Sequence, residues 1–600
     1  MTVRFMMAVF WILLCATGAF AQSKIAPPLQ KALDQAIEGN GTVRALIMLE
    51  DKVDILAFDQ QLYAESVSLN ERAYRVITTL QAKAEATQGS LLSFLASKSA
   101  DEVVRYQAFW VANIIAVEAQ PSVIMDLSTR LDVGYLQLDG ELKYDEPVAR
   151  EPATEVPNGV EPGLKVINAH LMWQAGITGA GVIVMGMDTG VDVNHPALSY
   201  KWKGNSVPAS QAWFDPNTGS PTPTDCDNHG THTMGTMTGL DPATHDTIGV
   251  AFGAEWIAAK TICSSPHTSN SISAFQWAMD PDGNPSTHED MPVGINNSWW
   301  DPSITSSTQC NPAQNPYIDV LTAVEASGIG VVFSAGNSGP SSTSITAPKN
   351  VNLSEVHFWA TGAVDGNNPS LPIASFSSRG PVVSSCLTGN SSLDIKPEAS
   401  APGVSVRSSI IGGGYSNFSG TSMAAPHVVG ALALLRQAHP NKTGAELKMA
   451  LYTTATDLGA VGEDNNYGMG VINVWAAHQS LADPDDPNDP ENVTAYSDFN
   501  TPTSIDLNWT DPTTYVNGDP LTNFTIEIYR DGANVASVAS GTETYSDGGL
   551  TDGQMYQYTV YAKDSNDSLS SGVDVSAYAG GSPVPAAPEN LSGSATTTEA

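Results

Sequence analysis

Short apolar runs that alternate with segments of helical spacing dominate the middle of this chain, residues 164–481. The clearest runs cover residues 181–187, 255–262, 293–299 and 330–335. Apolar and polar residues do not alternate within them, so each strand is expected to be buried on both faces. The pattern predicts an α/β domain built on a parallel sheet with helices on both faces. In such sheets, catalytic groups lie beyond the carboxyl ends of the strands.

The residues before this domain, 22–150, predict a smaller α/β unit. Strands are expected at 43–50, 109–118 and 134–138, helical spacing covers 64–97, and Pro121 opens a helix that runs to residue 131. This order suits a ferredoxin-like, split β-α-β sheet with helices on one face. The stretch 144–163 then contains four prolines and many charges. It predicts an exposed, cleavable linker.

A third unit follows the middle domain. Residues 482–491 are acidic, rich in proline and free of basic residues, and they predict an extended linker. Residues 492–580 alternate apolar and polar positions between turn signals, which predicts an all-β sandwich. Its aromatic core is expected to contain Trp509, Tyr529, Tyr558 and Tyr561.

A short repeat follows this predicted sandwich. The sequence Pro-Glu-Asn-Val that starts at Pro490 recurs as Pro-Glu-Asn-Leu at Pro588, about one sandwich domain later. Residues 588–600 are therefore expected to begin a second such domain, and the natural chain is expected to continue beyond them.

The first 21 residues have the pattern of a cleaved secretion signal. Arg4 supplies the positive start, residues 5–14 form an apolar run too short to span a bilayer, and Ala19 and Ala21 are the small residues of a cleavage site. We expect the chain to be secreted and cut after Ala21, with a buried N-terminal helix as the alternative. No other run in the sequence is long and apolar enough to cross a membrane.

The net charge limits the classes of binding partner, and the cysteines predict disulfides. A formal net charge of −37, from 63 acidic and 26 basic residues, disfavours nucleic acid and anionic membranes. The cysteines outside the predicted signal are Cys226, Cys263, Cys310 and Cys386. An even number in an exported chain predicts two disulfides, with three pairings open. A zinc site is disfavoured because none of the four stands in a Cys-x-x-Cys pair.

Three short segments carry residues suited to nucleophilic catalysis. Asp188 follows the run 181–187, His229 stands in Asn-His-Gly-Thr-His, and Ser422 stands in Gly-Thr-Ser-Met-Ala-Ala-Pro before an apolar helix. A serine hydroxyl needs a base to take its proton, imidazole titrates near neutrality, and a carboxylate orients the imidazole. A helix that begins at Ser422 would direct backbone N–H groups towards a developing oxyanion. Gly420 is expected to allow a tight turn and a close approach of the substrate backbone.

The chain order Asp, His, Ser and the three segments themselves resemble the subtilisin-like serine peptidases, the subtilase family, over residues 164–481. The resemblance implies a serine endopeptidase that cleaves proteins or peptides through an acyl-enzyme. It makes Ser422 the nucleophile, His229 the general base and acid, and Asp188 the orienting carboxylate. Asn337, in Ser-Ala-Gly-Asn-Ser-Gly, would donate to the oxyanion together with the backbone N–H of Ser422.

The same resemblance implies how substrate binds. Ser298, Trp299 and Trp300 match the family edge that pairs with a substrate backbone, and Ala335 and Gly336 are assigned to the same surface. The family usually has glycine where Trp300 stands. A tryptophan there would narrow or cap the primary specificity pocket, or turn outward, so no side-chain preference is transferred.

The flanking units gain expected roles in the same way. Residues 22–150 resemble an inhibitor-type propeptide, which would act as the enzyme's own inhibitor until it is cut. Residues 492–580 resemble a fibronectin type III domain, whose role stays open. The chemistry requires no cofactor. Structural calcium is compatible with the acidic loops, but no segment matches an EF-hand and no ligand is assigned. A monomer is expected.

Two other functions compete with this interpretation. A lipase or esterase of the α/β-hydrolase type needs a Gly-x-Ser-x-Gly elbow and the order Ser, Asp, His, and neither fits this sequence. A catalytically inactive surface-binding protein of the same fold is disfavoured because all four catalytic positions are intact. A single Asp or His is weak evidence for a catalytic role. Asp192, His232 and His427 are therefore expected to be structural.

Overall fold

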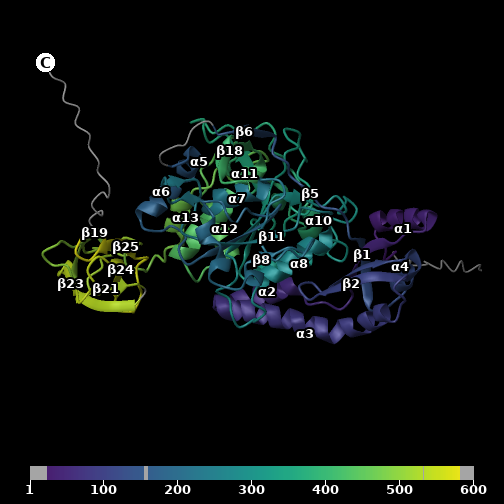
Figure 1. Cartoon of the computed structure of the whole chain (residues 1–600), viewed down its shortest axis with the longest axis horizontal. Coiled ribbons are helices and arrows are strands. Elements are labelled where there is room, and N and C mark those ends of the chain that lie inside the picture. Colours follow the sequence, from purple (N-terminus) through teal and green to yellow (C-terminus); the bar gives the residue numbers. More distant parts are fainter. Residues whose placement is uncertain (1–22, 154–159, 532, 582–600) are drawn as a thin grey trace, which may run out of the picture.

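The computed structural model describes residues 23–153, 160–531 and 533–581. Figure 1 shows a central α/β domain, a smaller N-terminal unit beside it and a C-terminal β-sandwich. The predicted secretion signal, 1–21, and the predicted start of a second sandwich, 588–600, lie outside the described residues. Among the described helices, none combines the length and the apolar character needed to cross a bilayer.

The central domain is built on a seven-stranded parallel sheet, as predicted, with the strand order β16-β15-β14-β12-β7-β11-β8. The strands are β7 (Ile183–Asp188), β8 (Trp213–Phe214), β11 (Glu255–Lys260), β12 (Gly294–Asn297), β14 (Gly330–Ser334), β15 (Trp359–Val364) and β16 (Ala399–Pro402). The run predicted as one strand at 293–299 is divided. After β12 ends, β13 (Trp299–Trp300) pairs outside this sheet.

Helices cover both faces of the sheet, which confirms the predicted layers. Successive strand residues point to opposite faces. Met185 therefore packs in one core cluster with α8 (Thr268–Met279) and α9 (Pro316–Ala326). Its neighbour Val184 packs in the other cluster, with the helices α7 (His229–Thr238), α11 (Thr421–Ala438), α12 (Gly444–Thr453) and α13 (Val474–Leu481).

The N-terminal unit contains a four-stranded antiparallel sheet with the order β2-β3-β1-β4. Its strands are β1 (Val43–Leu49), β2 (Val103–Phe109), β3 (Ile114–Ala119) and β4 (Val133–Leu138). Its helices are α1 (Pro27–Gly39), α2 (Ile55–Ala64), α3 (Leu69–Ala96) and α4 (Pro121–Ser128). From β1 onward the elements follow the order β-α-β-β-α-β of the predicted ferredoxin-like fold, with two helices in the first crossover.

Two predictions within this unit are wrong in detail. The strand predicted at 109–118 is the turn and second strand of a hairpin, because Asn113 adopts a left-handed φ of 53° between β2 and β3. The helical stretch predicted at 64–97 contains the end of one helix and a second complete one. Ser68 starts the second helix by accepting a hydrogen bond from the N–H of Glu71 at 3.3 Å.

The N-terminal unit packs against α8 and α9, and its apolar residues belong to the same core cluster as that face of the central sheet. Asp139 lies at the start of α8, where its Oδ1 accepts a hydrogen bond from the N–H of Ser269 at 2.8 Å. A carboxylate at a helix N-terminus is favourable. Further along α8, Gln276 Oε1 accepts a hydrogen bond from the N–H of Trp110 at 2.6 Å. The contact therefore combines apolar burial with fixed polar bonds.

The segment predicted as an exposed linker, 144–163, begins inside the structure. Strand β5 (Lys143–Tyr144) pairs antiparallel with β13, and β6 (Ala149–Pro152) pairs antiparallel with β18 (Gly414–Ser419). Between them, Asp145 is only 7% exposed. The prediction is wrong for this part because partners far away in the sequence satisfy the backbone and bury a charged side chain.

The C-terminal unit is a β-sandwich of two antiparallel sheets, as predicted. The three-stranded sheet contains β19 (Glu491–Tyr496), β20 (Ser504–Thr510) and β23 (Thr544–Gly548). The four-stranded sheet contains β21 (Phe524–Arg530), β22 (Ala533–Ala539), β24 (Met555–Asp564) and β25 (Val573–Tyr578). Trp509 and Tyr558 lie in its core, whereas Tyr529 and Tyr561 form a half-buried T-shaped pair outside the core cluster, so their predicted core position is wrong.

The acidic stretch 482–491 does not extend freely from the sandwich. Asn488 Nδ2 donates to the carbonyl oxygen of Tyr515 at 3.0 Å, and Asp489 Oδ1 accepts from the N–H of Gly572 at 2.6 Å. These bonds hold the second half of the stretch against the domain that follows it. The prediction of an extended linker, which rested on repulsion between its charges, is therefore wrong for this half.

The structure contains the two disulfides Cys226–Cys263 and Cys310–Cys386, one of the three pairings that the sequence left open. The first closes a loop with a sequence separation of 37 residues. Loop closure of that size stabilises a fold by about 4 kcal/mol. We expect Cys226→Ser with Cys263→Ser to lower the free energy of unfolding by about that amount in urea titrations. An unchanged unfolding midpoint would contradict this prediction.

Candidate active site

The structure brings the predicted residues to one edge of the central sheet. Asp188 is the last residue of β7, His229 is the first residue of α7, and Ser422 is the second residue of α11. All three are almost fully buried. The strand end and the two helix starts fix the backbones, so the side chains need little ordering before they act.

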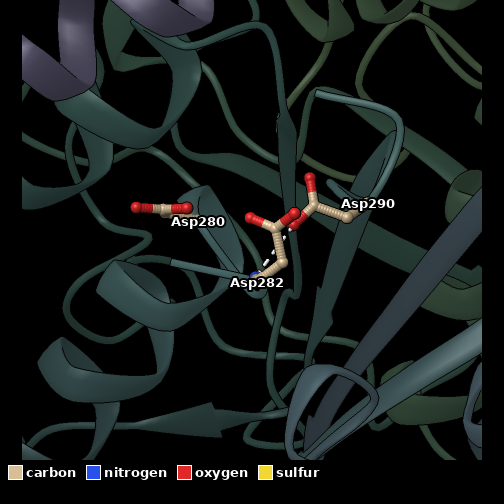
Figure 2. A group of neighbouring side chains, drawn as sticks. All are labelled: Asp280, Asp282 and Asp290. Carbon is tan, nitrogen blue, oxygen red and sulfur yellow. Dashed lines mark hydrogen bonds between the residues drawn. The ribbon is translucent and has the colours of Figure 1, made fainter. Parts of the chain in front are cut away.

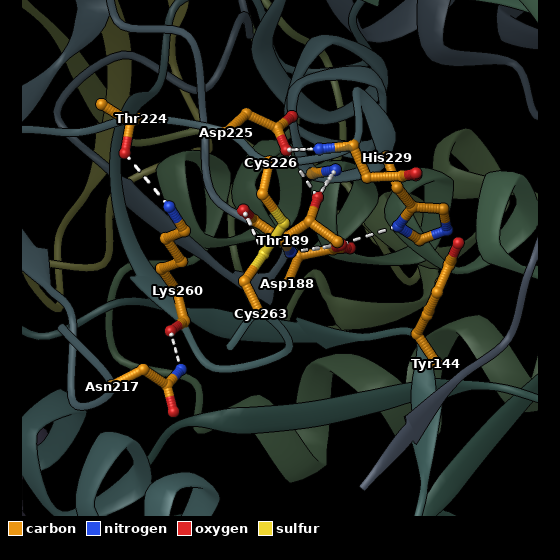
Figure 3. Close-up of a disulfide and its surroundings, with 12 residues drawn as sticks. Tyr144, Asp188, Thr189, Asn217, Thr224, Asp225, Cys226, His229, Lys260 and Cys263 are labelled. Atoms are coloured by element: carbon orange, nitrogen blue, oxygen red, sulfur yellow. Dashed lines mark hydrogen bonds and ion pairs between the residues drawn. A yellow bond between two sulfur atoms is a disulfide. The ribbon is translucent and has the colours of Figure 1, made fainter. Parts of the chain in front are cut away.

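Asp188 and His229 form a hydrogen-bonded pair (Figure 3). His229 Nδ1 lies 2.7 Å from Asp188 Oδ1, and Thr233 Oγ1 donates to Asp188 Oδ2 at 3.3 Å. Burial lowers the pKa of His229, but the carboxylates of Asp188, Asp225 and Asp227 together raise it above its ordinary value. The pair can therefore hold a proton on His229 once the ring has accepted one.

Asp225 accepts hydrogen bonds from residues that follow both members of this pair. No signal in the sequence indicates this role except that Asp225 lies four residues before His229. Its Oδ1 accepts from Thr189 Oγ1 at 2.7 Å, and its Oδ2 accepts from Thr231 N–H at 2.9 Å. The disulfide of the adjacent Cys226 ties the same loop to the chain beyond β11 (Figure 3). Both contacts hold the loop after Asp188 against the start of α7.

Ser422 Oγ is turned towards the N-terminal segment of the chain. It donates to the carbonyl oxygen of Asp145 at 2.7 Å. Within the described residues, His229 Nε2 has no hydrogen-bond partner. The ring nitrogen that would take the serine proton is therefore unused, and the serine hydroxyl contacts a peptide carbonyl.

Asn337 directs its amide N–H groups to the same place. Its Oδ1 accepts from the N–H and the Oγ1 of Thr421, both at 2.9 Å, which fixes the orientation of the amide. Its Nδ2 then donates to the carbonyl oxygen of Glu146 at 2.8 Å and lies 3.5 Å from that of Asp145. This is the position expected for a group that donates to an oxyanion.

Gly420 is the single residue between the end of β18 and the start of α11, and the chain bends there, as predicted. Its φ of 166° is extended backbone that any residue can adopt. A Cβ at this position would lie 3.3 Å from Asn337 Nδ2 and 3.5 Å from the Cα of Pro147. The distance to Pro147 is an ordinary van der Waals contact, so the missing side chain makes room mainly for the Asn337 amide, and the close approach of a substrate backbone stays a prediction.

The segment 142–152 crosses the active site, with β5 and β6 on either side of the irregular residues 145–148. On one side, Trp299 and Trp300 pair with Tyr144 and Lys143, and the N–H of Asp145 donates to the carbonyl of Ser298 at 2.9 Å. Beyond Ser422, β6 pairs with β18. The predicted edge 298–300 thus contacts an extended chain, and that chain belongs to the same molecule.

Side chains add to this backbone pairing. The ring of Tyr144 packs edge-on against His229 with centroids 5.4 Å apart (Figure 3). Trp299 itself points into the core, where it contacts Phe333, and it pairs with the segment through its backbone. Trp300 is half-buried and pairs through its backbone with Lys143.

The carboxylate of Asp145 occupies a buried site that we call the Lys349 site, formed by Ser334, Gly336 and Lys349. Asp145 Oδ2 accepts from Ser334 Oγ at 2.6 Å and from Lys349 Nζ at 2.8 Å. Gly336 has a φ of 103°, and a Cβ there would lie 3.7 Å from Asp145 Oδ1. The neighbouring Ala335 packs into a small apolar cluster instead. Sequence alone gives no signal for Lys349, because its partner lies 204 residues away.

The three residues expected to be structural have structural contacts. His232 Nε2 lies 3.0 Å from the carbonyl of Val406, and His427 Nδ1 lies 2.9 Å from that of Met423. Burial lowers the pKa of His232 to about 3 and that of His427 to about 4, so both rings are neutral near pH 7. Asp192 Oδ2 accepts from the N–H of Gly412 at 2.8 Å.

Three carboxylates gather on the loop between α8 and β12 (Figure 2). One oxygen each from Asp280, Asp282 and Asp290 lies within 4.8 Å of the others. Two oxygens already accept backbone N–H groups, Asp290 Oδ2 at 3.0 Å and Asp282 Oδ1 at 2.7 Å. Burial raises the pKa of Asp290 to about 6. Calcium takes about six to eight oxygen ligands, more than this cluster supplies, so we assign no calcium site.

Comparisons with known proteins agree with this geometry. The family model described as Subtilase family matches residues 179–470, and the model described as Fibronectin type III domain matches residues 488–573. "Bacillopeptidase F" of Bacillus subtilis (strain 168) is 32% identical over 495 residues, which are 77% of this chain and 33% of that protein. The chain thus spans about a third of the length of this relative.

Shorter relatives are covered more completely. The "Alkaline protease" of Shouchella clausii is 31% identical over 386 residues, 64% of this chain and 84% of that protein. "Subtilisin E" of Bacillus subtilis (strain 168) is 32% identical over 373 residues, 62% of this chain and 82% of that protein. The crystal structure of fervidolysin from Fervidobacterium pennivorans, a keratinolytic enzyme related to subtilisin, aligns with a TM-score of 0.49 and 18% identity, over 90% of this chain and 76% of that chain.

Proposed function

The chain belongs to the subtilase family of serine peptidases, and we propose that it is a secreted endopeptidase that cleaves proteins through an acyl-enzyme on Ser422. We further propose that residues 22–150 are a propeptide that inhibits the enzyme in its precursor. The observation that carries the proposal is the contact of Ser422 Oγ with the peptide carbonyl of Asp145, 2.7 Å away; the preceding residue, Tyr144, packs against His229 of the Asp188–His229 pair.

Each proposed step uses a group described above. Ser422 Oγ attacks the peptide carbonyl carbon while His229 Nε2 takes its proton, and Asp188 stabilises the resulting imidazolium. His229 then protonates the leaving amine as the C–N bond breaks. A water molecule, deprotonated by His229, attacks the ester and releases the acid product and Ser422. No cofactor takes part in these steps.

Inhibition of the precursor is supported by the way in which segment 142–152 lies over the nucleophile. Its pairing with β13 and β18 uses backbone hydrogen bonds that a protein substrate would also need. As long as the segment stays bound, no other chain can reach Ser422. Export, and removal of a signal after Ala21, are proposed from the sequence.

A fluorophosphonate probe tests the assignment of the nucleophile. We expect processed enzyme to be labelled at Ser422, with the site found by peptide mass spectrometry, and to hydrolyse casein. Labelled protein that cleaves esters but no peptides would favour an esterase. Processed protein that takes up no label would favour an inactive binding protein.

Asn337→Leu tests the proposed oxyanion donor. The change keeps the approximate shape of the side chain but removes its N–H groups, together with the Oδ1 that accepts from Thr421, so kcat is expected to fall about 10²–10³-fold. KM should change little, because the donor acts mainly on the transition state. Steady-state kinetics on a peptide p-nitroanilide measure both constants. The exposed Asn368→Leu is the matched control and should retain kcat; an equal loss in both variants would contradict the assignment.

A further inference from the structure

We propose that the Lys349 site makes this peptidase specific for aspartate immediately before the bond it cleaves, and that Lys349 is the specificity-determining residue. The inference rests on the proposed function, since it names the substrate class of the same active site. It also identifies Asp145–Glu146 as the bond that the precursor cuts in itself, which moves the end of the propeptide from residue 150 to Asp145.

The position of Asp145 in the active site supports this assignment. Its carbonyl oxygen accepts from Ser422 Oγ at 2.7 Å, and its N–H donates to the carbonyl oxygen of Ser298 at 2.9 Å. Asn337 Nδ2 lies 3.5 Å from the same carbonyl oxygen and 2.8 Å from that of Glu146, so the donor reaches both carbonyls that flank the Asp145–Glu146 bond. The residue whose carbonyl contacts the nucleophile is the one that precedes the scissile bond, and Asp145 is that residue. The side chain of Asp145 therefore marks the site that selects substrates.

That site is built for an anion. Lys349 is fully buried, and its Nζ donates to Asp145 Oδ2 and to the carbonyl of Trp299, each at 2.8 Å. Ser334 Oγ supplies a second donor to the same carboxylate oxygen at 2.6 Å. Two donors, one of them charged, converge on a single carboxylate oxygen. An amide oxygen can accept both hydrogen bonds but does not neutralise the charge of Lys349, and an apolar side chain does neither.

The location of the partner distinguishes this site from an ordinary buried ion pair. Within the described residues, the only salt bridge of Lys349 is the one to Asp145, which lies in the segment that is cut. An ion pair that only stabilised the central domain would have both partners in that domain. Once the N-terminal unit leaves, Lys349 keeps its place in the core and lacks a counter-charge. A substrate aspartate restores the pair, whereas a neutral residue leaves a desolvated cation without a partner.

Cleavage after Asp145 follows the proposed mechanism without any other reactant than water. Ser422 Oγ forms an ester with the carbonyl carbon of Asp145, and the bond to the nitrogen of Glu146 breaks as His229 protonates that nitrogen. Hydrolysis of the ester leaves Asp145 with a new α-carboxylate and regenerates Ser422. The enzyme then begins at Glu146.

Peptide p-nitroanilides of one sequence that end in Asp, Asn, Leu or Phe test the specificity of processed wild-type enzyme. We expect kcat/KM for Asp to exceed that for the isosteric Asn by about 100-fold or more, with Leu and Phe at or below Asn. Equal rates on Asp and Asn, or a preference for Leu or Phe, would overturn the inference and leave the peptidase assignment intact. Hydrolysis of none of the four would overturn both.

A charge-to-apolar exchange tests the same site within the precursor. We expect Asp145→Leu and Lys349→Met each to slow self-cleavage, and the double variant to process faster than either single variant. The double variant also yields processed Lys349→Met enzyme, which should have lost its preference for Asp over Asn. Glu141→Gln removes a charge from an exposed neighbour and should process normally. The mass of the released propeptide locates the cut; a cut elsewhere, or no rescue in the double variant, would overturn the inference.

Discussion

Replacing Ser422 by alanine is expected to lower peptide hydrolysis by about 10⁶-fold and to leave the secreted precursor uncut. Alanine removes the only atom that bonds covalently to the substrate, while the helix start and the oxyanion donors remain. Because segment 142–152 stays bound across the active site, the precursor should be as stable as the wild-type precursor. Casein hydrolysis, together with N-terminal sequencing of the secreted protein, measures both effects.

The exposed Ser341→Ala is the matched control and should be active and processed like the wild type. Processing of the Ser422→Ala precursor at the normal site and rate would show that another protease removes the N-terminal unit. Residual activity within about 100-fold of the wild type would exclude Ser422 as the nucleophile, because binding and oxyanion contacts alone do not sustain turnover at that level.

Asp188→Asn is expected to lower kcat by about 10⁴-fold and to change how the remaining activity depends on pH. The enzyme needs neutral His229 as its base, so activity falls as the pH drops through the pKa of His229. The carboxylates, Asp188 foremost, hold that pKa above its ordinary value against the opposing effect of burial. Without the Asp188 charge, burial dominates and the pKa falls. The acid limb of kcat/KM should therefore move to lower pH.

A pH profile of kcat/KM for processed enzyme between pH 5 and pH 9 measures the shift. Asp192→Asn makes the same chemical change four residues further along the chain, at a carboxylate that accepts its hydrogen bonds from backbone N–H groups in the part of the chain that the structure describes. It should leave both the rate and the acid limb unchanged. An acid limb that stays in place in Asp188→Asn would show that another group sets the pKa of His229.

Residues whose position in the fold follows from the local sequence pattern could be predicted from the sequence. Asp188, His229 and Ser422 each stand at the junction of a strand or a helix with a loop, and such junctions leave marks within a few residues of sequence. The parallel sheet was equally accessible, because strands buried on both faces must be continuously apolar.

The features that depend on distant partners could not be predicted. The apolar spacing at 109–118 does not reveal that Asn113 turns the chain in the middle of the run. The prolines around residue 147 indicate exposure, yet β13 and β18 bury the chain there. Lys349 stands among residues typical of a loop, and only the fold shows that its charge lies in the core beside Asp145.

One consequence follows from the fact that segment 142–152 reaches the active site while still joined to both neighbouring units. As long as the chain is intact, segment 142–152 is present at the active site at a fixed effective concentration, which does not depend on the concentration of the protein. After the proposed cut, the N-terminal unit would be a separate molecule held by its contacts with α8 and α9, and its occupancy of the active site would fall with dilution. The enzyme would remain inhibited where its concentration is high, close to the place of synthesis, and would become active once it is diluted into a large volume.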